Sequence, residues 1–285
     1  MKPADYAAGD VAAGRFRRAE LVFAKGGGRS TLMRQIAPYP FHITRPFALD
    51  RERPDLATLY LQSASGGIYR GDQLDLSLVV RAGAAAHVTS QAATVVHDTG
   101  AARARQTTGI EVGDGAFCAL TLDPLILFPG AELTVETSVR LAAGALAILA
   151  DGVAWHDFEG LDRPFGALTS DVSVRGPDGR TLVLDRATVD GREIVGSRAL
   201  LGPGGGAYGS ALLLGPADRL PEPGAIERAL DGVGCRAGAS PLPNGAGLGV
   251  RLIAANGGRI TAGVETIFTL GVEAMLGFSP ARRRK

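Results

Sequence analysis

The chain has 285 residues, 46% of them hydrophobic and 21% charged, and its formal net charge at pH 7 is +1. This length and hydrophobic content are sufficient for a sizeable core. The balanced charge gives no electrostatic reason to expect a nucleic-acid or membrane partner. The two cysteines, Cys118 and Cys235, lie far apart, indicate no disulfide framework and fit a reducing compartment. Because no apolar leader or membrane-length apolar run is visible, we expect a cytoplasmic protein.

Short strands are predicted along most of the chain, after a flexible tail at residues 1–13. Apolar and polar residues alternate in many segments, which is typical of half-buried strands, and the 40 glycines and 16 prolines fit the turns between them. The segments predicted as strands are 19–24, 31–36, 57–63, 73–81, 84–91, 106–112, 116–122, 131–141, 145–150, 168–174 and 181–184. We therefore expect a single, mainly β domain covering residues 1–285.

One turn pattern recurs along this series of strands. Gly83, Gly115 and Gly144 each precede an alanine in a turn between two alternating strands. Gly-Ala pairs are common in a chain rich in both residues, but strands flank all three copies. Their spacing of about thirty residues lies in the range of internal repeats. The repeat predicts successive strand pairs laid side by side, that is, helically stacked strands that form coiled sheet layers.

The C-terminal end, residues 223–285, is predicted to be helical. Apolar residues at helical spacing favour a main helix at 259–276, and a shorter helical stretch is expected at 225–230, just after Pro223. A strand is predicted between the two helices, at 248–254.

Segment 151–167 breaks the alternation and is predicted to be an irregular loop. Irregular loops on a β scaffold often carry contacts, so this segment is a candidate partner surface, with an ordinary connecting loop as an equally good interpretation. The residues concerned are Trp155, His156 and Asp157. The basic residues Arg282 and Arg283 near the end are more simply explained as a solvated terminus, and they are a second candidate for partner binding.

The sequence contains no motif for a chemical reaction that we recognise. The glycine-rich runs at 26–30 and 202–206 lack the Gly-Lys-Ser/Thr ending of a phosphate-binding loop, and Ser65 lacks the Gly-x-Ser-x-Gly setting of a hydrolase nucleophile. We assign no catalytic residue and expect that the protein is not an enzyme. Two alternatives stay open: a β-fold hydrolase that uses scattered carboxylates such as Asp72 and Asp151, and a non-catalytic β module that binds a ligand or carbohydrate.

Candidate metal ligands are few and scattered. His87 and His97 have no second histidine or cysteine at ligand spacing, so an exposed or locally hydrogen-bonded imidazole is the simpler interpretation. Asp72 opens a strand directly after a turn with three glycines, and an Asx-turn or backbone cap explains it most simply. Alternatively, its carboxylate is held in an interior passage where it could touch a hard or borderline cation.

Four short motifs occur in a characteristic order. They are Arg45-Pro46-Phe47, the pattern Gly66-Gly67-x-x-x-Gly71-Asp72, the run Ser90-Gln91-Ala92-Ala93-Thr94, and a corner with Pro124 and Phe128-Pro129-Gly130-Ala131. Their order and spacing, taken together, are fairly specific. From residue 15 onward the chain resembles the UreD family of urease accessory proteins.

The chain also departs from the pattern of that family. Val95-Val96-His97 stands where the family often has Lys-Val-Tyr, and Asp151 stands where it usually has Glu. The Gly-Arg and Gly-Glu elements that normally follow are not recognisable within 151–165, and the usual Trp is absent after Pro280. The contacts of segment 151–165 therefore have no support from the family pattern.

The resemblance implies a non-catalytic maturation chaperone of the cytoplasm. Members of the family form a helical stack of β-strands, bind UreF and, through it, the GTPase UreG, and assist nickel insertion into apo-urease. No tightly bound cofactor is implied, and nickel would be bound only transiently in an interior tunnel. The C-terminal helices and tail would face UreF. The residues that would line or shape the tunnel are Gly66, Gly67, Gly71, Asp72 and Asp151.

Overall fold

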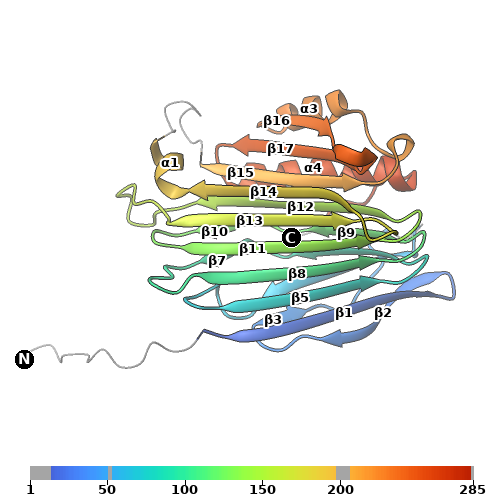
Figure 1. The fold of residues 1–285 in the computed structure, drawn as a ribbon, viewed down its shortest axis with the longest axis horizontal. Helices are drawn as coiled ribbons and strands as arrows, with labels where there is room; N and C mark the ends of the chain where they lie inside the picture. The colour runs from blue at the N-terminus through green and yellow to red at the C-terminus, as the bar shows by residue number, and fades with distance from the viewer. Residues whose placement is uncertain (1–13, 51–52, 197–205, 284–285) are drawn as a thin grey trace, which may run out of the picture.

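The computed structural model describes residues 14–50, 53–196 and 206–283. The tail expected at residues 1–13 lies outside the described residues. Most of the described chain forms two β-sheets whose strands are stacked from one end of the molecule to the other (Figure 1).

Sheet A has seven strands in the spatial order β14-β13-β11-β8-β5-β1-β2. Their bounds are β1 Phe16–Gly26, β2 Arg29–Ile36, β5 Gln73–Val80, β8 Ala104–Val112, β11 Glu132–Leu141, β13 Ala167–Arg175 and β14 Thr181–Asp190. The central strands β1, β5, β8, β11 and β13 run parallel, while β2 and β14 form antiparallel pairs at the two edges.

Sheet B has ten strands, eight of them in the order β16-β17-β15-β12-β9-β6-β4-β3, with β10 paired to β12 and β7 paired to β10. Strands β4, β6, β9 and β12 are parallel, and β15, β17 and β16 continue the sheet with antiparallel pairing. The bounds are β3 Phe41–Ile43, β4 Leu56–Ser63, β6 Ala85–Ser90, β7 Thr94–Val96, β9 Phe117–Thr121, β10 Leu125–Leu127, β12 Leu146–Trp155, β15 Ala207–Leu214, β16 Cys235–Pro241 and β17 Gly247–Ala254.

From β4 to β13 the chain passes back and forth between the two sheets. Strands β4, β6, β9 and β12 enter sheet B in turn, and β5, β8, β11 and β13 enter sheet A between them. Each return adds a parallel strand beside the previous one, as the colour gradient in Figure 1 shows. The prediction of a mainly β protein with helically stacked strands is confirmed.

The repeated Gly-Ala turns are the corners of this coil. Gly83, Gly115 and Gly144 join β5 to β6, β8 to β9 and β11 to β12, with φ of 65°, 59° and 65°. Such positive φ favours glycine. The amide of Gly83 donates to the carbonyl of Asp114 and that of Gly115 to the carbonyl of Ala143, both at 2.9 Å. Successive corners are therefore bonded to one another, which fixes the stacking of the coils.

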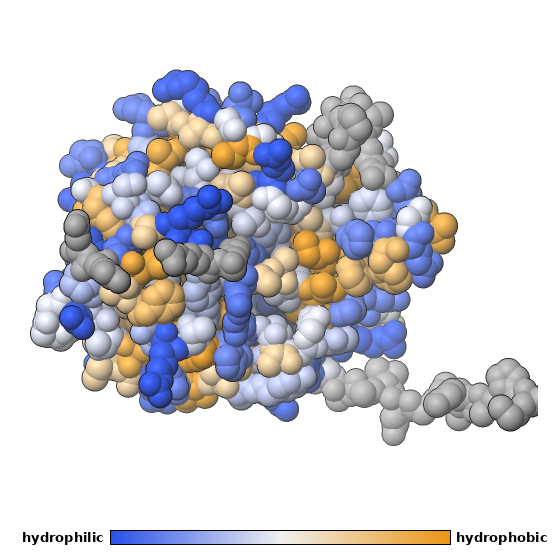
Figure 2. All heavy atoms as spheres, turned by 180° about the vertical axis from the view of Figure 1, so that it is seen from behind, coloured by the Kyte–Doolittle hydropathy of each residue, from blue (hydrophilic) through white to orange (hydrophobic). Residues whose placement is uncertain are grey.

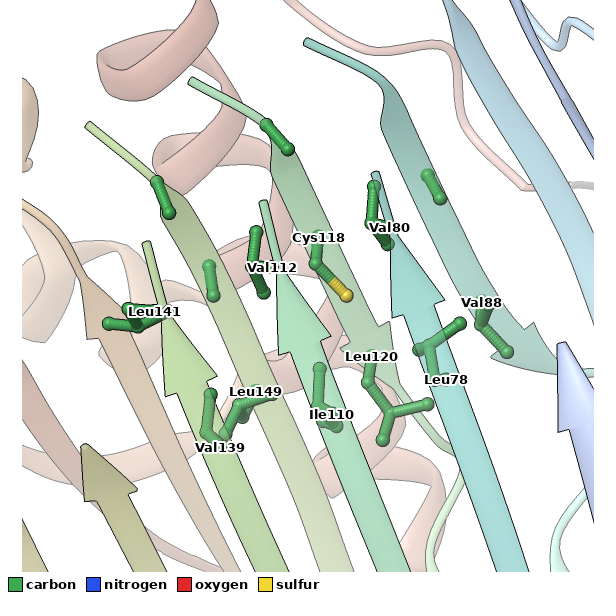
Figure 3. Close-up of a cluster of buried hydrophobic side chains, with 14 of the residues drawn as sticks. Leu78, Val80, Val88, Ile110, Val112, Cys118, Leu120, Val139, Leu141 and Leu149 are labelled. Carbon is green, nitrogen blue, oxygen red and sulfur yellow. The ribbon is translucent and has the colours of Figure 1, made fainter. Parts of the chain in front are cut away.

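The space between the sheets holds the largest apolar core. Strand β5 alternates as its sequence predicts, and its apolar side chains are buried while the polar ones between them are less so. Figure 3 shows how side chains from the two layers meet in this core. The labelled residues are Leu78, Val80, Val88, Ile110, Val112, Cys118, Leu120, Val139, Leu141 and Leu149.

Sheet B is buried on both faces, because helices cover the side that faces away from sheet A. Strand β6 consequently has no exposed residue at all. Buried residues of α4 such as Ile260, Ile267 and Val272 pack with those of β12, β15 and β17 in a second core. The helices and short 3₁₀ turns are α1 Gly191–Gly196, α3 Pro223–Gly232, α4 Gly257–Leu276, η1 Ala217–Arg219 and η2 Pro243–Gly245.

Two boundary predictions need correction. Strand β12 continues to Trp155, so the irregular part of segment 151–167 begins only at His156. Its alternation is inconspicuous because Gly152 and Ala154, the residues under the helices, are small. The C-terminal end is also only partly helical: the strand predicted at 248–254 is confirmed as β17, and β16, which was not predicted, joins it between α3 and α4 in sheet B.

The surface mixes apolar and charged side chains. On the face turned away in Figure 1, hydrophobic residues are interspersed with hydrophilic ones (Figure 2). Within the described ranges, no helix is long and apolar enough to cross a membrane.

Candidate functional site

A cavity of about 130 Å³ lies between the two sheets. Sheet A contributes Leu74, Val135 and Asp185 to its wall, and sheet B contributes Leu61 and Asp151, among other residues. A second cavity of about 100 Å³ adjoins it, since both are lined by Asp151 and Ser210. The two cavities extend the space between the sheets toward the apolar core, and most of their lining is apolar.

Asp151 is the charged group that these two cavities share. Along β12 the residues at 150, 152 and 154 face the helices, so 151 and 153 point between the sheets. Among the described residues, no group donates a hydrogen bond to the Asp151 carboxylate, and the side chain is exposed to the cavity. Enclosure by protein raises the pKa of Asp151 to about 6; the charge of Arg251 opposes this shift and that of Asp185 adds to it.

A surface hollow of about 360 Å³ leads toward this cavity. Gly66 and Gly67 line it together with the motif residues 91–94. Residues 61–63 and Thr94 line both the hollow and the cavity of Asp151, so the two spaces are adjacent. Gly66 and Gly67 line the hollow and Asp151 lines the cavity, so these sequence-predicted residues lie on two sides of the shared wall formed by residues 61–63 and Thr94. No cation is needed to explain the glycines.

Asp72 does not line the hollow or either of the two cavities. Its carboxylate is 2% exposed and forms an ion pair with Arg15. It accepts hydrogen bonds from Arg15 Nε at 2.8 Å, from the backbone amide of Arg15 at 3.2 Å and from the amide of Tyr69 at 2.8 Å. Burial alone would raise the pKa of Asp72, but these hydrogen bonds outweigh it and hold the pKa below its ordinary value. The interpretation as a cap of the local turn is correct, and the carboxylate also anchors the first strand.

Arg15 completes this anchor, which we call the Arg15–Asp72 latch. Its guanidinium also donates to the carbonyl of Gly67 at 3.3 Å and lies over the rings of Tyr39 and Tyr69. Gly71 belongs to the latch, because a side chain at the facing Gly14 would overlap the Gly71 carbonyl. The glycine turn at residues 66–72 therefore holds the wall of the surface hollow in place.

His87 was predicted to be exposed or locally hydrogen-bonded, and only the second part is correct. Its ring is 1% exposed, its Nε2 is 2.7 Å from Thr121 Oγ1, and it stacks on Phe268 with 4.0 Å between ring centres. Burial, with a smaller contribution from the charge of Arg283, lowers the pKa of His87 to about 3. The neutral imidazole fills the interface between sheet B and α4.

His97 belongs to a continuous row of rings and guanidinium groups, which we call the aromatic ribbon. Tyr69 stacks on His97 at 4.4 Å, and His97 meets Phe128 edge-on at 5.5 Å. Phe128 in turn contacts Phe158 at 5.2 Å and His156 at 6.0 Å. The ribbon comprises Tyr39, Arg15, Tyr69, His97, Phe128, His156, Phe158 and Arg163.

Only part of segment 155–157 is available to a partner. Trp155 is half-buried and donates its indole N–H to the carbonyl of Arg163 at 2.9 Å. Asp157 accepts from the amides of Glu159, Leu161 and Arg163 and from the Arg163 guanidinium, which lowers its pKa. These two side chains organise the loop. His156 is exposed.

The C-terminal arginines differ from each other. Arg282 is exposed, as predicted for a solvated terminus. Arg283 is not: its side chain is 3% exposed, and it donates to Thr89 of sheet B and to Glu265 of α4. The end of the described chain is therefore fastened to the scaffold, and the prediction of a solvated terminus is wrong for Arg283.

The candidate metal ligands do not form a cluster. In the part of the chain that the structure describes, no group of three or more His, Cys, Asp or Glu side chains is placed to hold a metal ion. Asp72, His87 and His97 lie in three different environments. Sequence reasoning missed Asp185, Tyr208 and Arg251, which lie in or beside the cavity. For Arg251, the available signal was a charge within the apolar strand β17.

Comparison with known proteins gives a consistent result. Residues 16–285 match the family model described as UreD urease accessory protein. The chain is 49% identical to urease accessory protein UreD 1 of Methylorubrum extorquens (strain PA1), over 100% of this chain and 97% of that relative. It is 50% identical to the UreD 1 protein of Methylorubrum populi over the same shares, and 31% identical to UreD 1 of Pseudomonas syringae pv. syringae over 94% of this chain and 95% of that relative. This chain therefore belongs to the UreD family of urease accessory proteins.

Proposed function

We propose that this chain is a non-catalytic accessory protein that helps to deliver nickel to apo-urease through the space between its two sheets. Membership of the UreD family supports a role in urease maturation. Nickel is the cargo in this proposal and is bound only transiently. The two free, buried cysteines fit a reducing cytoplasm as the site of action.

The observation that carries the proposal is the Asp151 carboxylate in the two cavities between the sheets, beside the surface hollow. An anionic oxygen in a mostly apolar channel attracts a cation without enclosing it in a full ligand set. Carboxylate oxygen is a poor match for nickel compared with imidazole, so a single carboxylate favours passage over storage.

The geometry favours this role over a hydrolase or carbohydrate-binding module. Pockets for organic ligands usually measure roughly 300–1,000 Å³, whereas the cavity beside Asp151 is about 130 Å³ and lies between the sheets. The size of this cavity suits an ion with a few water molecules better than a sugar ring with its neighbours.

The test is complementation in a urease-producing host that lacks its own UreD gene. Asp151→Asn keeps the shape of the side chain and removes its charge, so we expect urease activity and nickel per urease active site to fall about tenfold. The control is Asp171→Asn, because Asp171 forms its ion pair with Arg186 in a more exposed setting. Wild-type activity with Asp151→Asn would show that the carboxylate has no part in nickel delivery.

We further propose that UreF, and through it UreG, binds at the aromatic ribbon, in place of the C-terminal helices and tail that the family resemblance implies. Trp, Tyr and Arg side chains are enriched at binding hot spots, and large aromatic side chains bury much area at low entropic cost. Phe158 is 60% exposed, more than the ribbon residues Tyr39 at 57% and Tyr69 at 40%. Phe158→Ala should abolish co-purification with co-expressed UreF on size exclusion. Leu184→Ala, at a residue that is 62% exposed on β14, should leave the complex intact; loss of the complex in both variants, or in neither, would contradict this site.

A further inference from the structure

Three residues of sheet B form one row that leads from the cavity to the edge of the molecule. Asp151 of β12 is paired with Ser210 of β15, and Ser210 is paired with Arg251 of β17. Residues directly opposite on neighbouring strands project from the same face of the sheet. Since Asp151 and Ser210 line the cavities, Arg251 also points between the sheets.

Arg251 bridges the two sheets at this edge. Its Nη1 donates to Ser210 Oγ at 2.8 Å and its Nη2 to Asp185 Oδ2 at 2.5 Å. Asp185 belongs to β14, the edge strand of sheet A, and lines the same cavity as Asp151. The side chain of Arg251 is 41% exposed and that of Asp185 is 22% exposed, so the guanidinium has room to leave toward solvent.

With both carboxylates ionised, this group has one excess negative charge. Asp151 and Asp185 supply two negative charges and Arg251 supplies one positive charge. In the described part of the chain, the Asp151 carboxylate accepts no hydrogen bond, whereas Asp185 is occupied by Arg251. A divalent cation would neutralise both carboxylates, but only if the guanidinium moved away, because arginine does not lose its proton in proteins.

We propose that Arg251 is a resident counter-ion that competes with the nickel cargo for Asp185 and so keeps nickel binding beside Asp151 weak and reversible. This inference rests on the proposed function. It adds that the wall of the passage contains its own displaceable cation, and that the release of cargo is assisted when Arg251 returns to Asp185.

The test measures Ni²⁺ binding to the full-length chain by isothermal titration calorimetry, and Ni²⁺ release to a chelator by stopped flow. Arg251→Gln removes the competing charge, so we expect Ni²⁺ to bind at least tenfold more tightly and to leave at least tenfold more slowly than from the wild type. Arg251→Lys retains the charge and should stay within threefold of wild type. The double variant Arg251→Gln with Asp151→Asn should not bind Ni²⁺ more tightly than the wild type, because the tighter binding in Arg251→Gln depends on the carboxylate of Asp151.

Arg186→Gln is the matched control, since it removes another arginine that pairs across sheet A with Asp171 at 3.2 Å. It should bind Ni²⁺ like the wild type, and thermal melting should confirm that each variant is folded. Unchanged or weaker binding by folded Arg251→Gln would overturn the inference, as would undetectable binding by that variant. The proposed function fails separately, if the wild-type chain does not restore urease activity in the complementation assay.

Discussion

The Arg15–Asp72 latch makes a prediction about stability that is independent of nickel. Arg15→Met keeps much of the apolar length of the side chain and removes the guanidinium from a carboxylate that is 2% exposed. Breaking a fully buried ion pair by removing one partner costs about 3–5 kcal/mol. Because Arg15 is 21% exposed and the amides of Arg15 and Tyr69 still donate to Asp72, we expect the lower figure of about 2–3 kcal/mol.

The pH dependence of this loss is fixed by the direction of the pKa shift. The folded-state pKa of Asp72 lies below its ordinary value, so the latch stabilises the fold above that value, and the contribution is lost as the pH falls through the folded pKa. The wild type and Arg15→Met should therefore differ most at neutral pH and converge in acid.

Urea unfolding at pH 7, followed by circular dichroism, measures the effect. Asp72→Asn should cost less than Arg15→Met, since the charge that it leaves unpaired, Arg15, is 21% exposed whereas Asp72 is 2% exposed. The double variant should be more stable than the sum of the two losses indicates. Additive losses, or a loss below about 0.5 kcal/mol for Arg15→Met, the size usual for surface substitutions, would refute the latch.

Three further predictions concern single residues. His87 has a pKa of about 3 in the folded protein, far below its ordinary value, so between these two pH values the unfolded chain binds one more proton than the folded chain. Urea unfolding should therefore show that the free energy of unfolding falls as the pH drops below about 6.5. The fall should be smaller for His87→Phe, which has no imidazole to protonate. Gly144→Ala forces alanine into φ 65° and should lower the free energy of unfolding by about 1 kcal/mol, measured by urea unfolding. The control is Gly232→Ala at the end of α3, where nothing lies within 4 Å of the added methyl group, and it should leave the stability unchanged or raise it. Arg283→Met leaves the partly buried Glu265 without its cation and should lower the melting temperature by several degrees, about 2–4 °C per kcal/mol of lost stability. An unchanged melting temperature would show that the contacts of Arg283 near the C-terminus do not stabilise the fold.

The layered fold was predictable because it is encoded locally. Alternation in segments such as β5 and β11 sets the face that each strand buries, and the glycine corners at 83, 115 and 144 set where the chain changes sheet. The segment after Asp151 was misjudged because Gly152 and Ala154 lie under the helices. Their small side chains weaken the apolar signal on that face.

The site was only partly predictable because its members meet through tertiary structure. Asp151 was identified by family resemblance, but nothing near Asp185 or Arg251 in the sequence indicates that these two residues pair across the sheets. Asp72 stood out for its glycine turn, yet its partner Arg15 lies 57 positions earlier in the chain. A carboxylate in such a turn can be a ligand or an anchor, and only the position of its cation decides between them.

The same consideration explains why the three carboxylates have different roles on one scaffold. Asp72 has a guanidinium and two amides at hydrogen-bonding distance, so its charge is satisfied within the fold. Asp185 is paired with the guanidinium of Arg251, whose side chain is 41% exposed and can move away into solvent. Asp151 lines the cavities and, among the described residues, has no hydrogen-bond donor or ion-pair partner, so protein groups satisfy its charge least of the three. A mobile cation that enters between the sheets will gain most at Asp151, less at Asp185 and least at Asp72, so the order of the effects of the three Asp→Asn substitutions on nickel delivery should follow that sequence.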